Sequence, residues 1–314
     1  MCIENKHRGK VILAGAGPGD PELLTLKVFR FLKEADVIII DRLVSQAIIK
    51  ENIKEDAVII YVGKQGGKDE STSQQKINEL LVEHALQNKL VLRLKGGDVL
   101  FFSNILDELK TLTDNRIPYE IIPGVTAGSG AAAYAGIPLT ARGYSTSVRF
   151  LTCYEPEKIS SNLWSELAST DDTLVFYMSS EVLATVVTKL LEYNISSDKE
   201  LAVIEQATTP FQKVHVFNLS EFVKIDNVKK FASPTVIIIG KVVGLYDRFK
   251  WIENSVGEEN YFKPLENNAP SHKLTAATTR TAAAITTTTA AEAAGAWRTY
   301  LHGTCFVDHN AAAA

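Results

Sequence analysis

The sequence predicts an α/β protein built from two α/β domains. From Val11 to Ile122, short β-branched apolar runs alternate with segments whose apolar residues repeat at helical spacing. This alternation is typical of a mostly parallel sheet. Farther along, the gap between the expected strands that end at Glu205 and begin at Val214 is too short for a crossover helix, so these strands are expected to be antiparallel. A second domain with a mixed sheet follows from this change of pattern.

The expected boundaries follow the same patterns. Residues 8–142 form the first domain and residues 143–252 form the second. Of the 22 residues from Thr275 to Ala296, 18 are alanine or threonine, and no apolar stripe organises them. We therefore expect residues 253–314 to be a low-complexity tail, disordered or vector-derived, that takes no part in function.

Composition narrows the class of protein. The chain has 314 residues, 46% hydrophobic and 22% charged, as in soluble globular proteins. Its net charge of −4 offers no basic surface for nucleic acid. The three cysteines and six histidines show no metal-ligand spacing, no apolar run is long enough to span a membrane, and the polar N-terminus has no signal-peptide core. These features predict a cytoplasmic protein with no metal, nucleic-acid or membrane partner.

The first strand is expected at 11–14 and is followed by a glycine-rich loop. Asp20 is expected to cap the next helix, with proline in its first turn. The second strand, at 37–40, ends on Asp41. A strand, glycine loop, helix, strand and acidic residue in this order also occur in nicotinamide-binding folds. The loop here is Gly-Ala-Gly-Pro-Gly, however, and Pro18 lacks the N–H that a phosphate site uses.

A later strand, 91–95, stops at Gly96, Gly97 and Asp98. In open α/β sheets, ligands lie beyond the carboxyl ends of the strands. Glycines let a ligand approach the main chain closely, and a carboxylate can accept hydrogen bonds from ribose hydroxyls. A helix of very small residues is expected at 126–136, where it allows close approach of a ligand or of a neighbouring element. These features predict a ligand site at the strand ends.

Taken together, the strand-end motifs resemble those of the tetrapyrrole methyltransferase family. The resemblance is collinear over roughly residues 9–248, with weaker matches around Glu205 and Ser233. The resembling segments are Gly15–Leu26, Asp41–Ser45, Tyr61–Lys64, Arg93–Asp98, Pro123–Ala127, Gly130–Thr140, Ser147–Phe150 and Val175–Met178.

The resemblance implies a two-domain fold with S-adenosylmethionine in the cleft between the domains, and a homodimer. It places Asp41 where the family has its proton acceptor and Lys64 where it has its proton donor. The positions that match cofactor contacts are Pro18, Gly96, Gly97, Asp98, Phe101, Thr126, Ala127, Met178 and Ala207. S-adenosylhomocysteine would be the product.

The activity that the resemblance implies is C-methylation of uroporphyrinogen III at C2 and C7, giving precorrin-2 for sirohaem or cobalamin synthesis. This substrate carries eight carboxylates, so cations at strand ends and loops are candidate partners, arginine above all. Those cations are Arg42, Lys64, Lys68, Arg142 and Arg149. The predicted substrate-binding residues are Arg42, Asn104, Asp107 and Arg149.

The sequence also departs from the family pattern. Asn104 stands where the family has an arginine, Asp107 stands for the first of two glutamates, and Ser179 and Ala207 stand for glycines. The cofactor half of the site is therefore kept better than the substrate half. Three alternatives remain open: a methylase of another precorrin or tetrapyrrole, a degenerate cofactor-binding subunit without catalysis, and a nicotinamide oxidoreductase. A methylase of ribosomal RNA is disfavoured by the acidic net charge.

Overall fold

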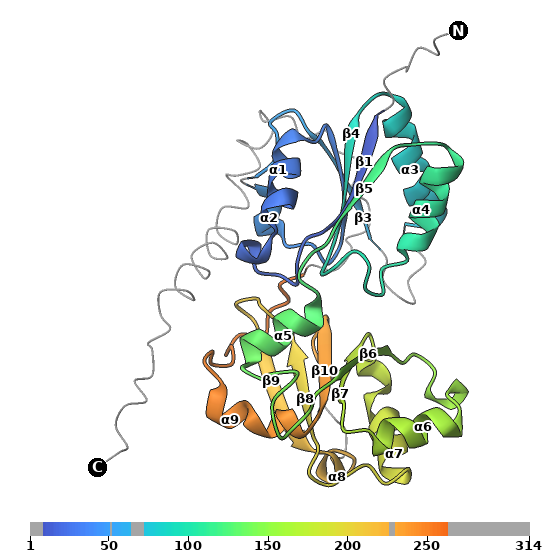
Figure 1. Ribbon diagram of the computed structural model, residues 1–314. Coiled ribbons are helices and arrows are strands. Elements are labelled where there is room, and N and C mark those ends of the chain that lie inside the picture. The colour runs from blue at the N-terminus through green and yellow to red at the C-terminus, as the bar shows by residue number, and fades with distance from the viewer. Residues whose placement is uncertain (1–8, 51, 64–71, 226–229, 263–314) are drawn as a thin grey trace. The chain divides into compact units, whose positions relative to one another are not determined.

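A computed structural model describes residues 9–50, 52–63, 72–225 and 230–262. The chain divides into two compact units between Thr126 and Ala127 (Figure 1). This division falls before the boundary expected at 142/143, because the helix at Ala127–Ala135 packs on the second sheet.

The first unit contains one five-stranded sheet. Its strands lie in the order β3-β2-β4-β1-β5, and every pair is parallel, as the sequence predicted. The elements are β1 (Lys10–Gly15), η1 (Pro21–Leu23), α1 (Leu26–Glu34), β2 (Val37–Asp41), α2 (Gln46–Lys50), β3 (Val58–Val62), α3 (Gln74–Leu86), β4 (Leu90–Lys95), α4 (Ile105–Asp114) and β5 (Tyr119–Ile122).

Alternate residues of these strands face two separate cores. Ile38 and Leu92 pack with helices α1 and α2 on one face of the sheet, and Ile39 and Val91 pack with α3 and α4 on the other (Figure 1). The connections that follow β1 and β2 therefore lead to helices on one face of the sheet, and the connection that follows β4 leads to a helix on the opposite face. This reversal beside β4 is a topological switch point, where α/β sheets bind ligands beyond the strand ends.

The helix expected to start at Asp20 is split in two. Asp20 accepts a hydrogen bond from the backbone N–H of Glu22 at 2.8 Å and caps only the short η1. Helix α1 has its own cap, Thr25, which accepts a bond from the backbone N–H of Val28.

The second unit has a mixed five-stranded sheet in the order β6-β7-β10-β8-β9. The pairs β10–β7, β10–β8 and β8–β9 are antiparallel, as predicted for the short connection, and β6–β7 is parallel. Its elements are α5 (Ala127–Ala135), β6 (Val148–Thr152), η2 (Pro156–Lys158), α6 (Ser161–Ser169), β7 (Thr173–Tyr177), η3 (Ser180–Val182), α7 (Leu183–Glu192), β8 (Glu200–Glu205), β9 (Lys213–Asn218), α8 (Leu219–Phe222), β10 (Thr235–Gly240), η4 (Lys241–Leu245) and α9 (Tyr246–Phe249).

Helices α6, α7 and α8 pack on one face of the second sheet, and the small-residue helix α5 packs on the other. A Cβ added to Gly128 would stand 2.6 Å from the hydroxyl oxygen of Tyr177 and 2.9 Å from the ring of Phe150. The backbone N–H of Gly128 donates to the same hydroxyl at 2.7 Å. The dense glycines and alanines of this helix therefore serve close packing on the sheet at this position.

The second unit extends into the stretch that was expected to belong to the tail. Asn254 bonds the backbone of Val214 through both its side-chain oxygen and nitrogen, at 2.7 and 2.9 Å. The side chain of Gln206 donates to the carbonyl of Glu259 and accepts from the N–H of Tyr261. Residues 253–261 are thus part of the folded unit, whereas residues 263–314 lie outside the described part.

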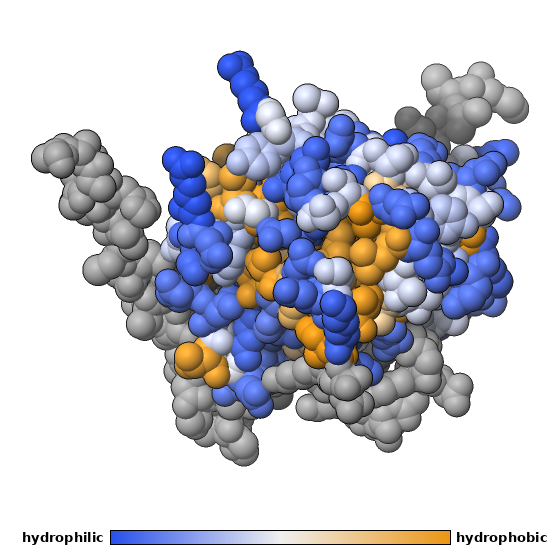
Figure 2. Space-filling view, turned by 90° about the horizontal axis from the view of Figure 1, so that it is seen from below, coloured by the Kyte–Doolittle hydropathy of each residue, from blue (hydrophilic) through white to orange (hydrophobic). Residues whose placement is uncertain are grey.

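One face of the molecule shows hydrophilic residues over much of its surface, with apolar residues in patches between them (Figure 2). Across the described residues, every helix is too short or too polar to span a membrane.

Candidate active site

The ends of β1, β4 and β5 meet in a tight arrangement of glycine backbones. Gly17 and Gly97 exchange two backbone hydrogen bonds, of 3.1 and 2.7 Å, and both have positive φ angles, 76° and 68°. A Cβ added to Gly15 would lie 2.5 Å from the carbonyl oxygen of Gly97. These glycines are therefore needed for contact between backbones. The Gly17–Gly97 hydrogen bonds join the loops that follow β1 and β4.

Asp98 ties the ends of two strands together. Its Oδ1 accepts from the backbone N–H of Leu100 at 2.7 Å, and its Oδ2 accepts from that of Gly124 at 2.9 Å. A carboxylate oxygen has a second lone pair, so the predicted contact with ribose hydroxyls stays a prediction beside this structural role.

Other predicted cofactor residues surround these strand ends. A Cβ added to Gly96 would stand 2.7 Å from the carbonyl oxygen of Leu43, so Gly96 lies against the loop after β2. Pro18 is buried in the loop after β1. Phe101 is partly exposed, and its ring meets that of Phe102 edge-on at 6.4 Å between centroids.

Four charged side chains of the first unit lie close together near the carboxyl ends of the adjacent strands β2 and β4. Asp41 ends β2, and its Oδ1 lies 2.6 Å from Nη2 of Arg93 on β4. The Nε of Arg93 lies 3.1 Å from Oε1 of Glu108 on α4, and Nζ of Lys95 lies 3.2 Å from the same oxygen. Two cations and two carboxylates therefore form one neutral group, which we call the β2–β4 charge cluster.

Sequence reasoning singled out Asp41 but missed the other members of the cluster. Arg93 and Lys95 occupy alternate positions of an otherwise apolar strand, so both point to the same face of the sheet. Buried charges in such a strand require partners of opposite sign. That rule could have directed attention to Glu108, which lies on the helix that covers this face.

The predicted substrate residues near this edge have different environments. Nε of Arg42 is buried and, within the described chain, has no hydrogen-bond partner, and burial lowers the pKa of this guanidinium. Asn104 adopts a left-handed conformation, with φ of 53°, just before α4, and its side chain makes no capping bond.

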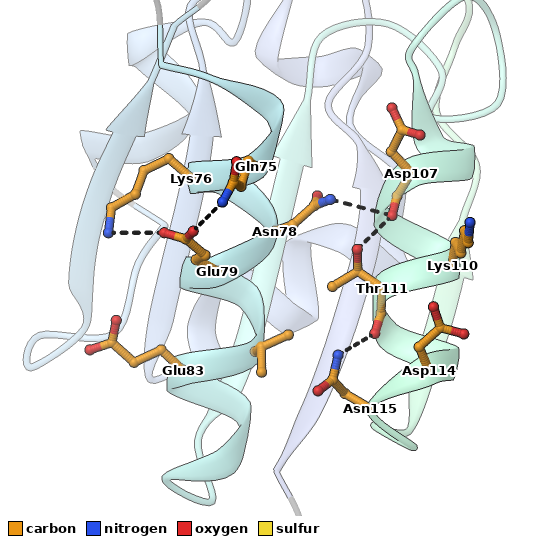
Figure 3. Close-up of a pocket in the computed structure, with 11 residues that line it drawn as sticks. Gln75, Lys76, Asn78, Glu79, Glu83, Asp107, Lys110, Thr111, Asp114 and Asn115 are labelled. Carbon is orange, nitrogen blue, oxygen red and sulfur yellow. Dashed lines mark hydrogen bonds and ion pairs between the residues drawn. The ribbon is translucent and has the colours of Figure 1, made fainter.

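Asp107 lies in a groove of about 760 Å³ between α3 and α4 (Figure 3). Its carbonyl oxygen accepts from the hydroxyl of Thr111 at 2.9 Å, and Asn78 of α3 approaches the same oxygen at 3.5 Å. The acidic residue of α4 that reaches the charge cluster is therefore Glu108 and not Asp107.

In the second unit, two predicted cofactor residues follow strand ends at the same edge of the sheet, because β7 and β8 both run antiparallel to β10. Met178 follows β7 with φ of 55°, the residue is 47% exposed, and its sulfur accepts from the Tyr154 hydroxyl at 2.8 Å. Ala207 follows β8 between Gln206 and Thr208, which both have positive φ angles. Left-handed residues of this kind concentrate at functional sites.

Ser179, which stands for a family glycine, has a structural task. Its hydroxyl donates to the carbonyl of Tyr177 at 2.8 Å and accepts from the backbone N–H of Cys153 at 2.9 Å. The hydroxyl thus joins the ends of β6 and β7.

Arg149 on β6 is engaged by two carboxylates of its own unit. Its Nη1 lies 2.5 Å from Oε1 of Glu166, and its Nε pairs with Asp172. Hydrogen bonds from Ser147 and Arg149 hold the pKa of Asp172 at about 2, and the two carboxylates raise that of Arg149. For Arg149 to bind a substrate carboxylate, one of these pairs has to be exchanged.

The remaining predicted residues are placed as follows. Thr126 and Ala127 stand on either side of the division between the units. Lys64 and Lys68 lie outside the described residues. In the described ranges, no group of three or more His, Cys, Asp and Glu side chains is placed to hold a metal ion.

The model of one protein family, described as tetrapyrrole (corrin/porphyrin) methylases, matches residues 10–223. The chain belongs to this family. Its two α/β units have the tetrapyrrole methylase fold, which confirms the fold that the resemblance implied.

Similar tetrapyrrole methylases include a siroheme synthase of Saccharophagus degradans, which is 46% identical over 244 residues, 77% of this chain and 53% of that protein. A siroheme synthase of Escherichia coli is 43% identical over 249 residues, 79% of this chain and 53% of that protein. The chain therefore spans about half the length of the curated relatives it matches.

Among solved structures, the uroporphyrin-III C-methyltransferase of Thermus thermophilus is 32% identical, with a TM-score of 0.64 over 77% of this chain and 96% of that one. A structure of that enzyme complexed with S-adenosylhomocysteine has a TM-score of 0.62, 32% identity, and covers 76% of this chain and 100% of that one.

Proposed function

We propose that this tetrapyrrole methylase transfers methyl groups from S-adenosylmethionine to C2 and C7 of uroporphyrinogen III and so makes precorrin-2. The observation that carries the proposal is the placement of Asp41. It ends a strand at the switch point of the parallel sheet, where a buried arginine holds one of its oxygens. The similarity to uroporphyrin-III C-methyltransferase supports the choice of substrate.

S-adenosylmethionine supplies a methyl group made electrophilic by its sulfonium centre. The residues present fit such a cofactor in three respects. Glycine backbones at the ends of β1 and β4 leave no side chain in the way, Asp98 keeps free lone pairs for hydroxyls, and the exposed side chain of Met178 offers an apolar contact. The similar enzyme complexed with S-adenosylhomocysteine supports this assignment.

In the proposed reaction, the methyl group for an electron-rich ring carbon of the substrate would come from S-adenosylmethionine held by the glycine backbones, Asp98 and Met178, and the donor would leave as S-adenosylhomocysteine. The ring then carries a positive charge and loses a proton. Asp41 accepts this proton, and its Oδ2 is suited to do so because, within the described chain, that oxygen has no partner. The larger contribution of the protein is to align carbon, methyl and sulfur.

Arg42 is the proposed partner for a substrate carboxylate in the first unit. Its Nε has no acceptor within the described chain, and a guanidinium binds a carboxylate through two parallel hydrogen bonds. We further propose that the protein acts in the cytoplasm as a homodimer, that Lys64 donates a proton, and that its product feeds sirohaem or cobalamin synthesis. Light scattering of the purified protein tests the dimer.

The deciding experiment is anaerobic turnover of uroporphyrinogen III with S-adenosylmethionine, followed by mass spectrometry and the optical spectrum of the oxidised products. We expect a dimethylated product. Asp41→Asn should lower kcat by about 10²–10⁴-fold, because it removes the proton acceptor, and leave the Kd for S-adenosylhomocysteine within about twofold. Asp114→Asn, an exposed aspartate of α4, is the matched control and should behave as wild type. A large loss of cofactor affinity in Asp41→Asn would remove its assignment as the base.

The altered loop after Asp98 favours a second candidate, methylation of another precorrin. Asn104 stands in this loop where the family has an arginine. Binding of S-adenosylhomocysteine without turnover of uroporphyrinogen III, together with methylation of a different tetrapyrrole, would establish this second candidate.

A further inference from the structure

The β2–β4 charge cluster contains one group that reaches solvent and three that do not. The side chains of Arg93, Lys95 and Glu108 are 2%, 5% and 0% exposed, whereas that of Asp41 is 30% exposed. Of the four, Asp41 is therefore the member able to meet a ligand, and the others can act only through it.

The guanidinium of Arg93 is held on three sides. Its Nη1 lies 3.4 Å from each of the carbonyl oxygens of Ile39 and Leu94, its Nε meets Glu108, and its Nη2 donates to Asp41. A planar guanidinium with its other N–H groups engaged has one orientation left, so it presents Nη2 to Asp41 in a fixed direction. Burial works against the charge of Arg93, but Asp41 and Glu108 outweigh it and raise its pKa above the ordinary value.

Glu108 is held in turn by Lys95. The Nζ of Lys95 donates to Oε1 of Glu108 and, at 2.5 Å, to the carbonyl oxygen of Ser103 in the loop before α4. The start of α4 is thereby tied to the end of β4. Lys95, held by Ser103, fixes the carboxylate of Glu108, and that carboxylate fixes Arg93. The restraint on Arg93 therefore comes from two elements, β4 and α4, and not from one side chain.

We infer that Arg93 is a positioning residue for the reaction, which fixes Oδ1 of Asp41 so that Oδ2 faces the substrate in a single orientation. Glu108 holds Arg93 in place and balances its charge. This inference rests on the proposed role of Asp41 as proton acceptor. Proton transfer requires a donor–acceptor distance of about 2.6–3.2 Å, so a carboxylate free to rotate would lose that geometry for part of the time.

The test uses two variants that keep every charge of the cluster. Arg93→Lys keeps the cation but has no planar fork to span Asp41 and Glu108, and Glu108→Asp shortens the arm that holds Arg93. We expect Arg93→Lys to lower kcat on the order of 10–100-fold, since small misplacements near a reacting centre have effects of this size. Glu108→Asp should show a smaller decrease. KM for uroporphyrinogen III and Kd for S-adenosylhomocysteine should stay within about twofold in both.

A double-mutant cycle separates positioning from a merely structural role. If Arg93 acts through Asp41, the double variant Asp41→Asn/Arg93→Lys should have the kcat of Asp41→Asn alone. A further loss of the same size as in Arg93→Lys would overturn the inference. So would an unchanged kcat in Arg93→Lys.

Crystal structures of the wild-type protein and of Arg93→Lys give a second readout that needs no activity. We expect one Asp41 conformer in the wild type and several conformers, or one displaced conformer, in the variant. An Asp41 carboxylate that keeps its position in Arg93→Lys would overturn the inference. If the wild-type protein methylates no tetrapyrrole, the proposed function is wrong, and these structures alone decide whether Arg93 positions Asp41.

Discussion

Replacing Glu108 by Gln should destabilise the first unit strongly. Glu108 is fully buried, and its Oε1 accepts from both Arg93 and Lys95. The substitution keeps the shape of the side chain but removes its charge, so two buried cations are left to share Asp41. Its new amide N–H groups would also occupy the position of Oε2, which has no partner among the described residues. Removing one partner of a buried ion pair typically costs about 3–5 kcal/mol, and we expect a loss in that range.

The loss should depend on pH in a defined direction. Burial lowers the pKa of Lys95, and Glu108 opposes this shift. Without Glu108 the pKa of Lys95 falls further, so the folded state binds fewer protons than the unfolded state over a wider range of pH. Stability rises with pH wherever the unfolded state binds more protons, so the deficit of Glu108→Gln should shrink between neutral pH and the ordinary lysine pKa of about 10.4.

Hydrogen exchange of the β4 backbone amides is the suitable assay. Tryptophan fluorescence would miss the effect, because the tryptophans of the described chain, Trp164 and Trp251, both belong to the second unit. Glu79→Gln is the control, since Glu79 is half exposed, pairs with Lys76 at 3.5 Å, and should change stability by less than about 0.5 kcal/mol. A loss below about 1 kcal/mol in Glu108→Gln, or a deficit that does not shrink as pH rises, would refute the reasoning.

Three further predictions test other parts of the structure. Met178→Ala should weaken binding of S-adenosylhomocysteine about 5–30-fold by removing an apolar contact worth about 1–2 kcal/mol, and an unchanged Kd in calorimetry would argue against the predicted cofactor set. Gly96→Ala should lower the free energy of unfolding by about 1–3 kcal/mol, measured with denaturant, because the added Cβ would stand 2.7 Å from the carbonyl oxygen of Leu43. Gly240→Ala is the control and should have a smaller effect, because its Cβ would keep 3.5 Å from Thr173. Asp172, with its pKa at about 2, stabilises the fold above pH about 4, and this contribution should disappear as pH falls through about 2. The acid-unfolding curve of Asp172→Asn should therefore lack that step, and an unaltered curve would contradict the assigned pKa.

Local patterns in the sequence determined much of this protein. Apolar runs of strand length bounded by glycine or acid located β1, β2 and β4, and their order with the helices between them predicted a parallel sheet. The short gap between β8 and β9 predicted the antiparallel pairing of the second sheet. These features are readable because burial of a strand or helix face leaves a period of about 2 or 3.6 residues in the chain itself.

Tertiary structure decided the pairing of the charges and the place where the two units divide. Arg93 meets a carboxylate 52 positions away and another 15 positions away, and no local pattern records which strand lies beside which. The same holds for Arg149, expected to be available to a substrate but paired with Glu166 and Asp172. Which side chains share an ion pair or a core depends on the order of the strands and on the layer in which each helix lies. Both exist only once the sheet is assembled, so these contacts followed from the fold and not from the local sequence.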